Sequence, residues 1–180
     1  MGDLATASLI IYGFVLYGMT RIGKTATAHL LSGNPLRGIK KGGQDMVITS
    51  TSKNYSAKIG NTMNSETVIP NKFELKNYKV NGETACVVDT PGYGDTYGVL
   101  KILANGFFHY RLYSKIQNMK FIVCFDSISV KNTGKDTIDT IVQFTKSFKD
   151  YVSMKEKIWN SCCFLFTKVD LNEDSIETIK

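Results

Sequence analysis

Eight residues near the start of the chain have the types and the spacing of a loop that binds phosphate groups. Residues 18–25 fit the pattern G-x-x-x-x-G-K-T and lie between an apolar run and a segment that can form a helix. The glycines let backbone N–H groups point inward, and the helix presents its positive dipole end to the phosphates. We therefore expect phosphate contacts from Gly18, Met19, Thr20, Arg21, Ile22, Gly23, Lys24 and Thr25.

Lys24 and Thr25 have separate roles in such a loop. The Lys24 ammonium would reach the β- and γ-phosphates of a nucleotide, and the Thr25 hydroxyl would be a ligand of Mg²⁺. The alternative is an ordinary glycine-bearing turn between a strand and a helix. Two motifs further along the chain favour the phosphate-binding interpretation.

The first of these motifs is Asp89-Thr90-Pro91-Gly92, directly after the predicted strand Thr84 to Val88. A carboxylate at the end of such a strand can hold Mg²⁺, commonly through a water, and the Gly92 N–H can sense a terminal phosphate. The alternative is a Pro-Gly turn with a polar residue before it. The phosphate-binding pattern upstream favours the metal-binding role for Asp89 and the phosphate-binding role for Gly92.

The second motif is Thr167-Lys168-Val169-Asp170, which follows the apolar run Cys162 to Phe166. The Asp170 carboxylate can accept from both the ring N–H and the exocyclic amine of guanine, a pair that adenine lacks. A buried carboxylate facing the wrong base would be left unpaired, so this contact discriminates strongly. The stem of Lys168 can lie along the base. We expect guanine contacts from Thr167, Lys168 and Asp170.

The elements that carry these motifs alternate between strands and helices, apart from one hairpin with the turn signal Asn81-Gly82. This order predicts a three-layer α/β fold of the P-loop NTPase type, with a mostly parallel sheet and its sites at the carboxyl ends of the strands. The expected strands are Leu9 to Tyr17, Met46 to Thr51, Asn54 to Ile59, Lys72 to Val80, Thr84 to Asp89, Phe121 to Phe125 and Ser161 to Phe166. The expected helices run from the phosphate loop to Ser32, from Val99 to Ile116, from Asp136 to Lys155 and from Asn172 to Ile179.

Two of the expected helices have apolar stripes, and residues 33–44 are expected to be a loop. Leu100, Leu103, Phe107 and Tyr110 share one face of the helix from Val99. The stripe predicted to be buried on the helix from Asp136 consists of Ile138, Ile141, Val142, Phe148 and Val152.

Composition is that of one soluble globular domain over residues 1–180, with 43% hydrophobic and 21% charged residues. The net charge is +6, but Lys and Arg are spread along the chain, so we expect no nucleic-acid partner. The four cysteines at 86, 124, 162 and 163 lie in apolar runs and are expected to be buried free thiols in a reducing compartment, which favours the cytoplasm. The longest apolar run is too short to span a bilayer.

The three motifs together resemble the translation-factor-related class of P-loop GTPases. DTPGYGDT at residues 89–96 and TKVD at residues 167–170 are most similar to septins and to GIMAP/Toc immunity-associated GTPases. Ser65-x-Thr67-x-x-Pro70-Asn71 and residues 104–108 also resemble uncharacterised protist GTPase-like proteins. The resemblance implies a Ras-like G domain that binds GTP and GDP with Mg²⁺. It also implies a switch-one threonine on the metal, for which Thr67 is preferred and Thr49 and Thr51 are the alternatives.

The chain departs from the family pattern at two places. Tyr93 stands where Ras-like enzymes have the glutamine that orients the attacking water, which implies slow hydrolysis, aided by groups supplied across a homodimer at the nucleotide face. Arg21 and Arg111 are expected to be structural or solvent-facing, so no catalytic residue is assigned. Only ten residues follow Asp170, so we expect a G domain that is shortened and incomplete at its C-terminus.

Three functions compete at this point. The first is a nucleotide-controlled switch with weak Mg²⁺-dependent GTPase activity, and the second is an inert module that binds nucleotide in order to assemble. The third is an ATP-using P-loop enzyme, which TKVD disfavours. The resemblance to septins and Toc-like proteins makes membrane contact conceivable, but no segment of the sequence supports it.

Overall fold

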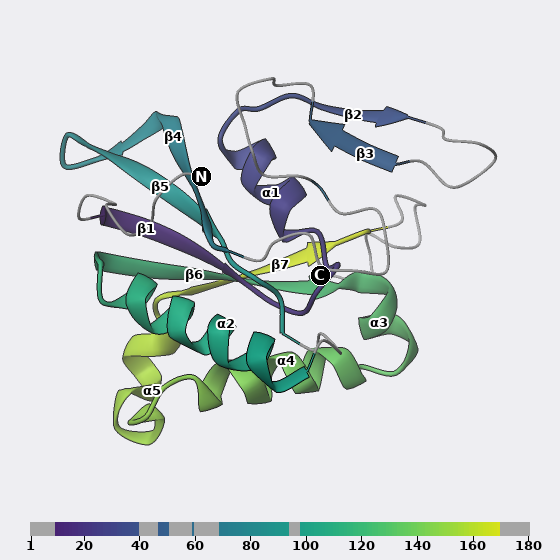
Figure 1. The fold of residues 1–180 in the computed structure, drawn as a ribbon, viewed down its shortest axis with the longest axis vertical. Coiled ribbons are helices and arrows are strands. Elements are labelled where there is room, and N and C mark those ends of the chain that lie inside the picture. Colours follow the sequence, from purple (N-terminus) through teal and green to yellow (C-terminus); the bar gives the residue numbers. More distant parts are fainter. Residues whose placement is uncertain (1–9, 40–46, 51–58, 60–68, 94–97, 170–180) are drawn as a thin grey trace.

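A five-stranded mixed sheet forms the middle layer of the computed structural model, which describes residues 10–39, 47–50, 59, 69–93 and 98–169 (Figure 1). The strand order is β4-β5-β1-β6-β7, and a separate two-stranded sheet pairs β2 with β3. The strands are β1 (Ile10–Tyr17), β2 (Leu36–Ile39), β3 (Val47–Ser50), β4 (Asn71–Val80), β5 (Glu83–Asp89), β6 (Ile116–Asp126) and β7 (Cys162–Thr167). The helices are α1 (Lys24–Leu31), α2 (Gly98–Tyr113), α3 (Ser127–Asn132), α4 (Lys135–Lys146) and α5 (Tyr151–Trp159).

Strand β1 lies in the centre of the main sheet because its side chains are apolar on both faces. It pairs in parallel with β5 on one side and with β6 on the other, and β7 extends the sheet in parallel beyond β6. The β4–β5 pair is antiparallel and turns at Asn81 and Gly82, whose φ values of 51° and 84° are those of a tight hairpin turn. The predicted fold class, α/β with a mostly parallel sheet and one antiparallel hairpin, is therefore confirmed.

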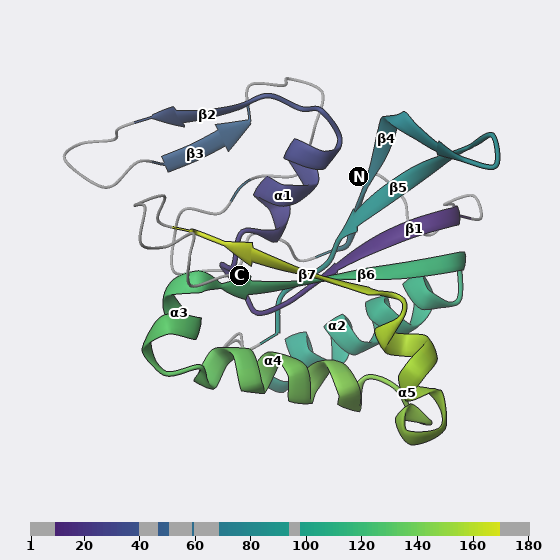
Figure 2. The same cartoon turned by 180° about the vertical axis from the view of Figure 1, so that it is seen from behind.

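Helices cover both faces of this sheet and complete the three layers. Figures 1 and 2 show α1 on one face and α2, α4 and α5 on the other. On the α1 side, Leu16 and Val87 pack with Phe73 and Ala28. On the opposite side, the core contains Val15, Tyr17, Val88, Leu112, Phe121, Val123, Phe125, Phe144 and Ile158. Within the described residues, no helix has the length and apolar character needed to cross a membrane.

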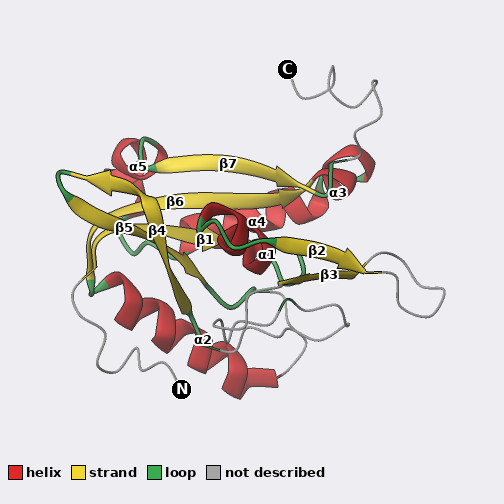
Figure 3. Cartoon of the chain, turned by 90° about the horizontal axis from the view of Figure 1, so that it is seen from above, coloured by secondary structure: helices red, strands yellow, loops and turns green. Residues whose placement is uncertain are grey.

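The polar stretch after α1 contains a strand that the sequence did not predict. Leu36–Ile39 forms β2 and pairs antiparallel with β3, so the prediction of a loop over all of residues 33–44 is wrong for these four positions. The pairing places Ile39 opposite Val47, and cross-strand pairs of this kind stabilise short strands. Figure 3 shows this small sheet lying beside α1 and apart from the main sheet.

The long helix predicted from Asp136 to Lys155 is two helices. It is broken between Lys146 and Tyr151, where the Ser147 hydroxyl donates to the Gln143 carbonyl and Asp150 has the non-helical φ and ψ of −109° and 39°. The break lets the Phe148 ring pack on Phe121 and Phe144. The stripe predicted to be buried is wrong at three positions, because Ile138, Val142 and Val152 are exposed and α4 instead buries Thr140 and Phe144.

Helix α2 also differs from its prediction. It ends at Tyr113, and Ile116 begins β6 rather than ending the helix. Leu103, Phe107 and Tyr110 are exposed, whereas Leu112 is buried against the sheet.

The cysteines are free thiols, but they are not all buried. Cys86 and Cys124 are buried as predicted, Cys162 is partly exposed, and Cys163 is exposed. The exposure follows from the position of β7 at one edge of the described sheet (Figure 3), so the prediction of four buried thiols is wrong for the last two.

Candidate functional site

The predicted phosphate loop, residues 18–25, leaves β1 at the point where the order of the strands reverses. Open α/β sheets place their ligands at the carboxyl ends of the strands beside such a switch point. Gly18 has a φ of 154°, and a Cβ there would lie 2.9 Å from the Cys124 carbonyl of β6, so the residue must be small. Arg21 and Gly23 have φ values of 69° and 97°, a left-handed conformation that costs about 1–2 kcal/mol for a residue with a side chain. The loop therefore holds strain at Arg21.

Lys24 bends back over the loop that precedes it. Its ammonium donates to the Gly18 carbonyl at 3.0 Å and to the Met19 carbonyl at 2.7 Å, and the residue is only 6% exposed. These contacts hold the charge of a nearly buried lysine above the loop. The ammonium is thus fixed against the first two residues of the predicted phosphate loop.

Thr25 and Asp89 lie together although they come from different motifs. The Thr25 hydroxyl donates to Asp89 Oδ2 at 2.8 Å, and Asp89 is fully buried. The neighbouring Thr90 hydroxyl donates to the Leu16 carbonyl at 2.6 Å, which fixes the end of β5 against β1. Two hard oxygen atoms at one point beside the phosphate loop fit Mg²⁺, which prefers oxygen ligands and keeps several waters.

The third predicted metal ligand is not placed. Thr67 and its alternative Thr51 lie outside the described residues. Thr49 lies in β3, opposite Arg37 of β2, but its side chain is not described. The choice among the three threonines stays a prediction.

Gly92 and Tyr93 lie directly against the phosphate loop. The Thr20 N–H donates to the Tyr93 carbonyl at 3.1 Å, and Met19 and Tyr93 form an isolated parallel bridge. A Cβ at Gly92 would overlap the backbone nitrogen and the hydroxyl of Thr20, so only glycine fits at this approach. The predicted sensor of the terminal phosphate is therefore in contact with the loop.

The Tyr93 side chain belongs to the core beneath the loop. Its ring centroid lies 5.1 Å from that of Tyr17, and burial raises the pKa of its hydroxyl. His109 of α2 also lies near Tyr17, with ring centroids 6.4 Å apart. Burial, together with the positive charge of Lys24, lowers the pKa of His109 to about 4, so its imidazole is neutral at pH 7.

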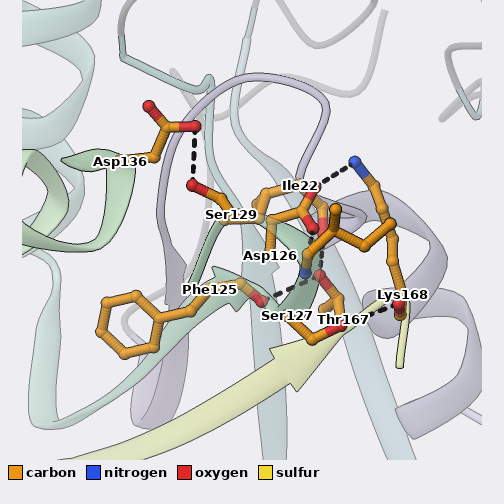
Figure 4. A network of polar contacts seen from close by, with 9 residues as sticks. Ile22, Phe125, Asp126, Ser127, Ser129, Asp136, Thr167 and Lys168 are labelled. Carbon is orange, nitrogen blue, oxygen red and sulfur yellow. Dashed lines mark hydrogen bonds and ion pairs between the residues drawn. The ribbon is translucent and has the colours of Figure 1, made fainter. Parts of the chain in front are cut away.

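The third motif is attached to the phosphate loop by Thr167. Its hydroxyl donates to the Ile22 carbonyl at 2.6 Å and also lies 3.1 Å from the Phe125 carbonyl (Figure 4). Lys168 has a φ of 54°, and its ammonium forms an ion pair with Asp126 at 2.6 Å. The structure thus brings Thr167 to the phosphate loop and holds Lys168 at the end of β6, and Asp170 lies outside the described residues.

Sequence reasoning missed the residues that hold Lys168 in place. Asp126 ends β6 and accepts from the Ile128 N–H as the N-cap of α3, while the Ser127 hydroxyl donates to the Lys168 carbonyl at 2.8 Å (Figure 4). A signal was present, because Asp-Ser after an apolar strand is typical of a helix N-cap at the carboxyl edge of the sheet. His109 gave no comparable signal.

Comparison with known proteins gives matches among solved structures alone. No family model matches the chain, and no curated protein sequence matches it. Nucleolar GTP-binding protein 1 of Plasmodium falciparum has a TM-score of 0.46 and 11% identity, over 96% of this chain and 86% of that chain. The FeoB G-domain of Methanococcus jannaschii has a TM-score of 0.40 and 14% identity, over 95% and 96% of the two chains. The cytosolic domain of T. maritima FeoB has a TM-score of 0.41 and 13% identity, and this chain spans 61% of its length. Each of these TM-scores is below 0.5.

Proposed function

We propose that this chain binds guanine nucleotides together with Mg²⁺ and hydrolyses GTP slowly, as a nucleotide-controlled switch. The observation that carries the proposal is the hydrogen bond from Thr25 to Asp89 at 2.8 Å, because it joins the phosphate loop to the second motif. The bond from Thr167 to the Ile22 carbonyl joins the third motif to the same loop. Three separate sequence motifs therefore meet at one end of the sheet.

Each part of this arrangement has a task in nucleotide binding. The loop N–H groups and Lys24 hold the phosphates, and Thr25 and Asp89 hold Mg²⁺, directly or through water. A bound Mg²⁺ neutralises charge on the phosphates. Thr167 and Lys168 are assigned to the side of the site that receives the base, and the ion pair with Asp126 positions the Lys168 stem. We assign guanine preference to Asp170.

Slow turnover follows from the position of Tyr93. Its ring packs on Tyr17 in the core, with the Thr140 hydroxyl near its own, so it is not directed at the phosphates. No side chain at this position would orient an attacking water, and we therefore expect weak intrinsic hydrolysis. Groups supplied by a second copy across the nucleotide face would raise the rate, so the rate should increase with protein concentration.

The competing proposal is an assembly module that binds nucleotide without turnover. The packing of the Tyr93 ring on Tyr17 favours it, since this side chain does not supply the water-orienting group. Single-turnover hydrolysis of GTP, measured at low and high protein concentration, separates the two. Detectable Mg²⁺-dependent product supports the switch, and its absence at both concentrations with GTP bound supports the inert module.

Base selectivity is tested by Asp170→Asn. Exchange of the carboxylate for an amide should weaken GTP binding and improve binding of xanthosine triphosphate, because the amide can donate to the xanthine oxygen. Lys155→Gln, at an exposed position of α5, serves as the control and should leave both affinities unchanged. Retained guanine preference in Asp170→Asn would mean that another residue reads the base.

A further inference from the structure

Thr20 is the third residue of the phosphate loop, and its backbone N–H and its side-chain hydroxyl differ in their hydrogen bonding. Its backbone N–H donates to the Tyr93 carbonyl at 3.1 Å. Its hydroxyl oxygen is buried and has no hydrogen-bond partner among the described residues. Buried polar groups in proteins are nearly always paired, so this hydroxyl requires an explanation.

The surroundings of the Thr20 hydroxyl place it between the phosphate loop and the second motif. A Cβ at Gly92 would overlap this hydroxyl, so the oxygen faces the glycine that is predicted to sense a terminal phosphate. Lys24 lies on the same loop, with its ammonium on the carbonyls of Gly18 and Met19, the residues just before Thr20. The hydroxyl thus lies against Gly92, on the loop whose preceding carbonyls hold the Lys24 ammonium.

We infer that Thr20 determines the preference for a nucleoside triphosphate over a diphosphate. This role rests on the proposed function and assigns recognition of the third phosphate to Thr20. The hydroxyl donates to an oxygen of the third phosphate and gains there the partner that it lacks in the described structure. A diphosphate ends before this point and leaves the hydroxyl unpaired.

The test is the substitution Thr20→Val, which keeps the branched shape and the backbone N–H and removes the hydroxyl. We expect affinity for a non-hydrolysable GTP analogue to fall about tenfold, the loss expected for a hydrogen bond to a charged group, with less than a twofold change for GDP. Thr20→Ser keeps the hydroxyl and should retain most of the preference. Titration calorimetry with Mg²⁺ present measures all of these affinities.

The matched control is Thr137→Val on α4, because the Thr137 hydroxyl is also buried without a partner among the described residues. This variant should leave both affinities unchanged. Thermal unfolding without nucleotide should show no loss of stability for Thr20→Val, since the hydroxyl removed makes no contact that stabilises the described fold.

The outcomes separate this inference from the proposed function. Equal loss of GDP and analogue binding in Thr20→Val, or no loss of either, would overturn the role of Thr20 and leave guanine-nucleotide binding intact. Failure of the folded wild-type protein to bind either nucleotide would overturn both.

Discussion

Lowering the pH below 6.5 should destabilise the protein through His109. The imidazole lies near the rings of Tyr17 and Tyr113, at centroid distances of 6.4 and 5.8 Å, and its Nε2 has no partner among the described residues. Burial, and then the charge of Lys24, lower the pKa of His109 to about 4 from its ordinary value of 6.5. The folded protein therefore opposes protonation of this side chain.

The sign and size of the effect follow from proton linkage. Between pH 6.5 and about 4 the unfolded chain binds a proton at His109 and the folded chain does not, so the free energy of unfolding falls as the pH falls. The loss from this group is about 2 kcal/mol at pH 5 and approaches roughly 3 kcal/mol below pH 4.

Urea unfolding at pH values from 4.5 to 7.5 measures this dependence. Carboxylates also titrate in this range, so the His109 component is the difference between the slopes of the wild type and His109→Asn. The variant should start from a lower or similar stability at pH 7.5 and lose about 2 kcal/mol less between pH 7 and 5 than the wild type. Identical slopes in the two proteins would refute the assignment of a lowered pKa to His109.

Three further substitutions test other contacts. Asp89→Ala should weaken the Mg²⁺ dependence of GTP binding more than it weakens GDP binding without metal, and identical Mg²⁺ titrations would refute its metal role. Thr167→Val should remove the hydrogen bond to the Ile22 carbonyl, lower the free energy of unfolding by about 1–2 kcal/mol and weaken GDP binding. Calorimetric titrations and unfolding curves identical to those of the wild type would contradict this role of Thr167. Phe144→Ala should lower the free energy of unfolding, measured in urea, by about 3–5 kcal/mol. The fully buried ring contacts the rings of Tyr17, Phe121, Phe148 and Trp159. A loss below about 1 kcal/mol would show that the surrounding residues close over the site without leaving a cavity.

Short-range signals explain which elements could be predicted from the sequence. The phosphate loop needs glycine or strained backbone at fixed positions, so its pattern indicates its conformation directly, as the φ values at Gly18 and Gly23 show. The hairpin turn at Asn81 and Gly82 depends in the same way on two adjacent residues that tolerate positive φ. The end of β5 at Asp89 was found because a buried apolar run ends there in a carboxylate.

Features that depend on contacts between distant residues could not be predicted. Strand β2 exists because it pairs with β3, and nothing within Leu36–Ile39 indicates that pairing. The helix break near Ser147 depends on the Tyr17 hydroxyl, 3.2 Å from that of Ser147, and on rings from β6 and α4 that enclose Phe148. The ion pair between Lys168 and Asp126 joins β7 to β6, so it becomes visible only once the two strands are adjacent.

The central claim is that the three motifs form one guanine-nucleotide site, and calorimetric titration of the purified chain tests it most directly. GDP and a non-hydrolysable GTP analogue are titrated into the protein in the presence of Mg²⁺. ATP serves as the control for base selectivity, and Lys24→Ala is the variant without the phosphate-binding ammonium. We predict micromolar or tighter binding of both guanine nucleotides, much weaker binding of ATP, and loss of binding in Lys24→Ala. The claim would be contradicted by a wild-type protein that unfolds cooperatively yet binds none of these nucleotides. It would also be contradicted by affinity for ATP equal to that for the GTP analogue.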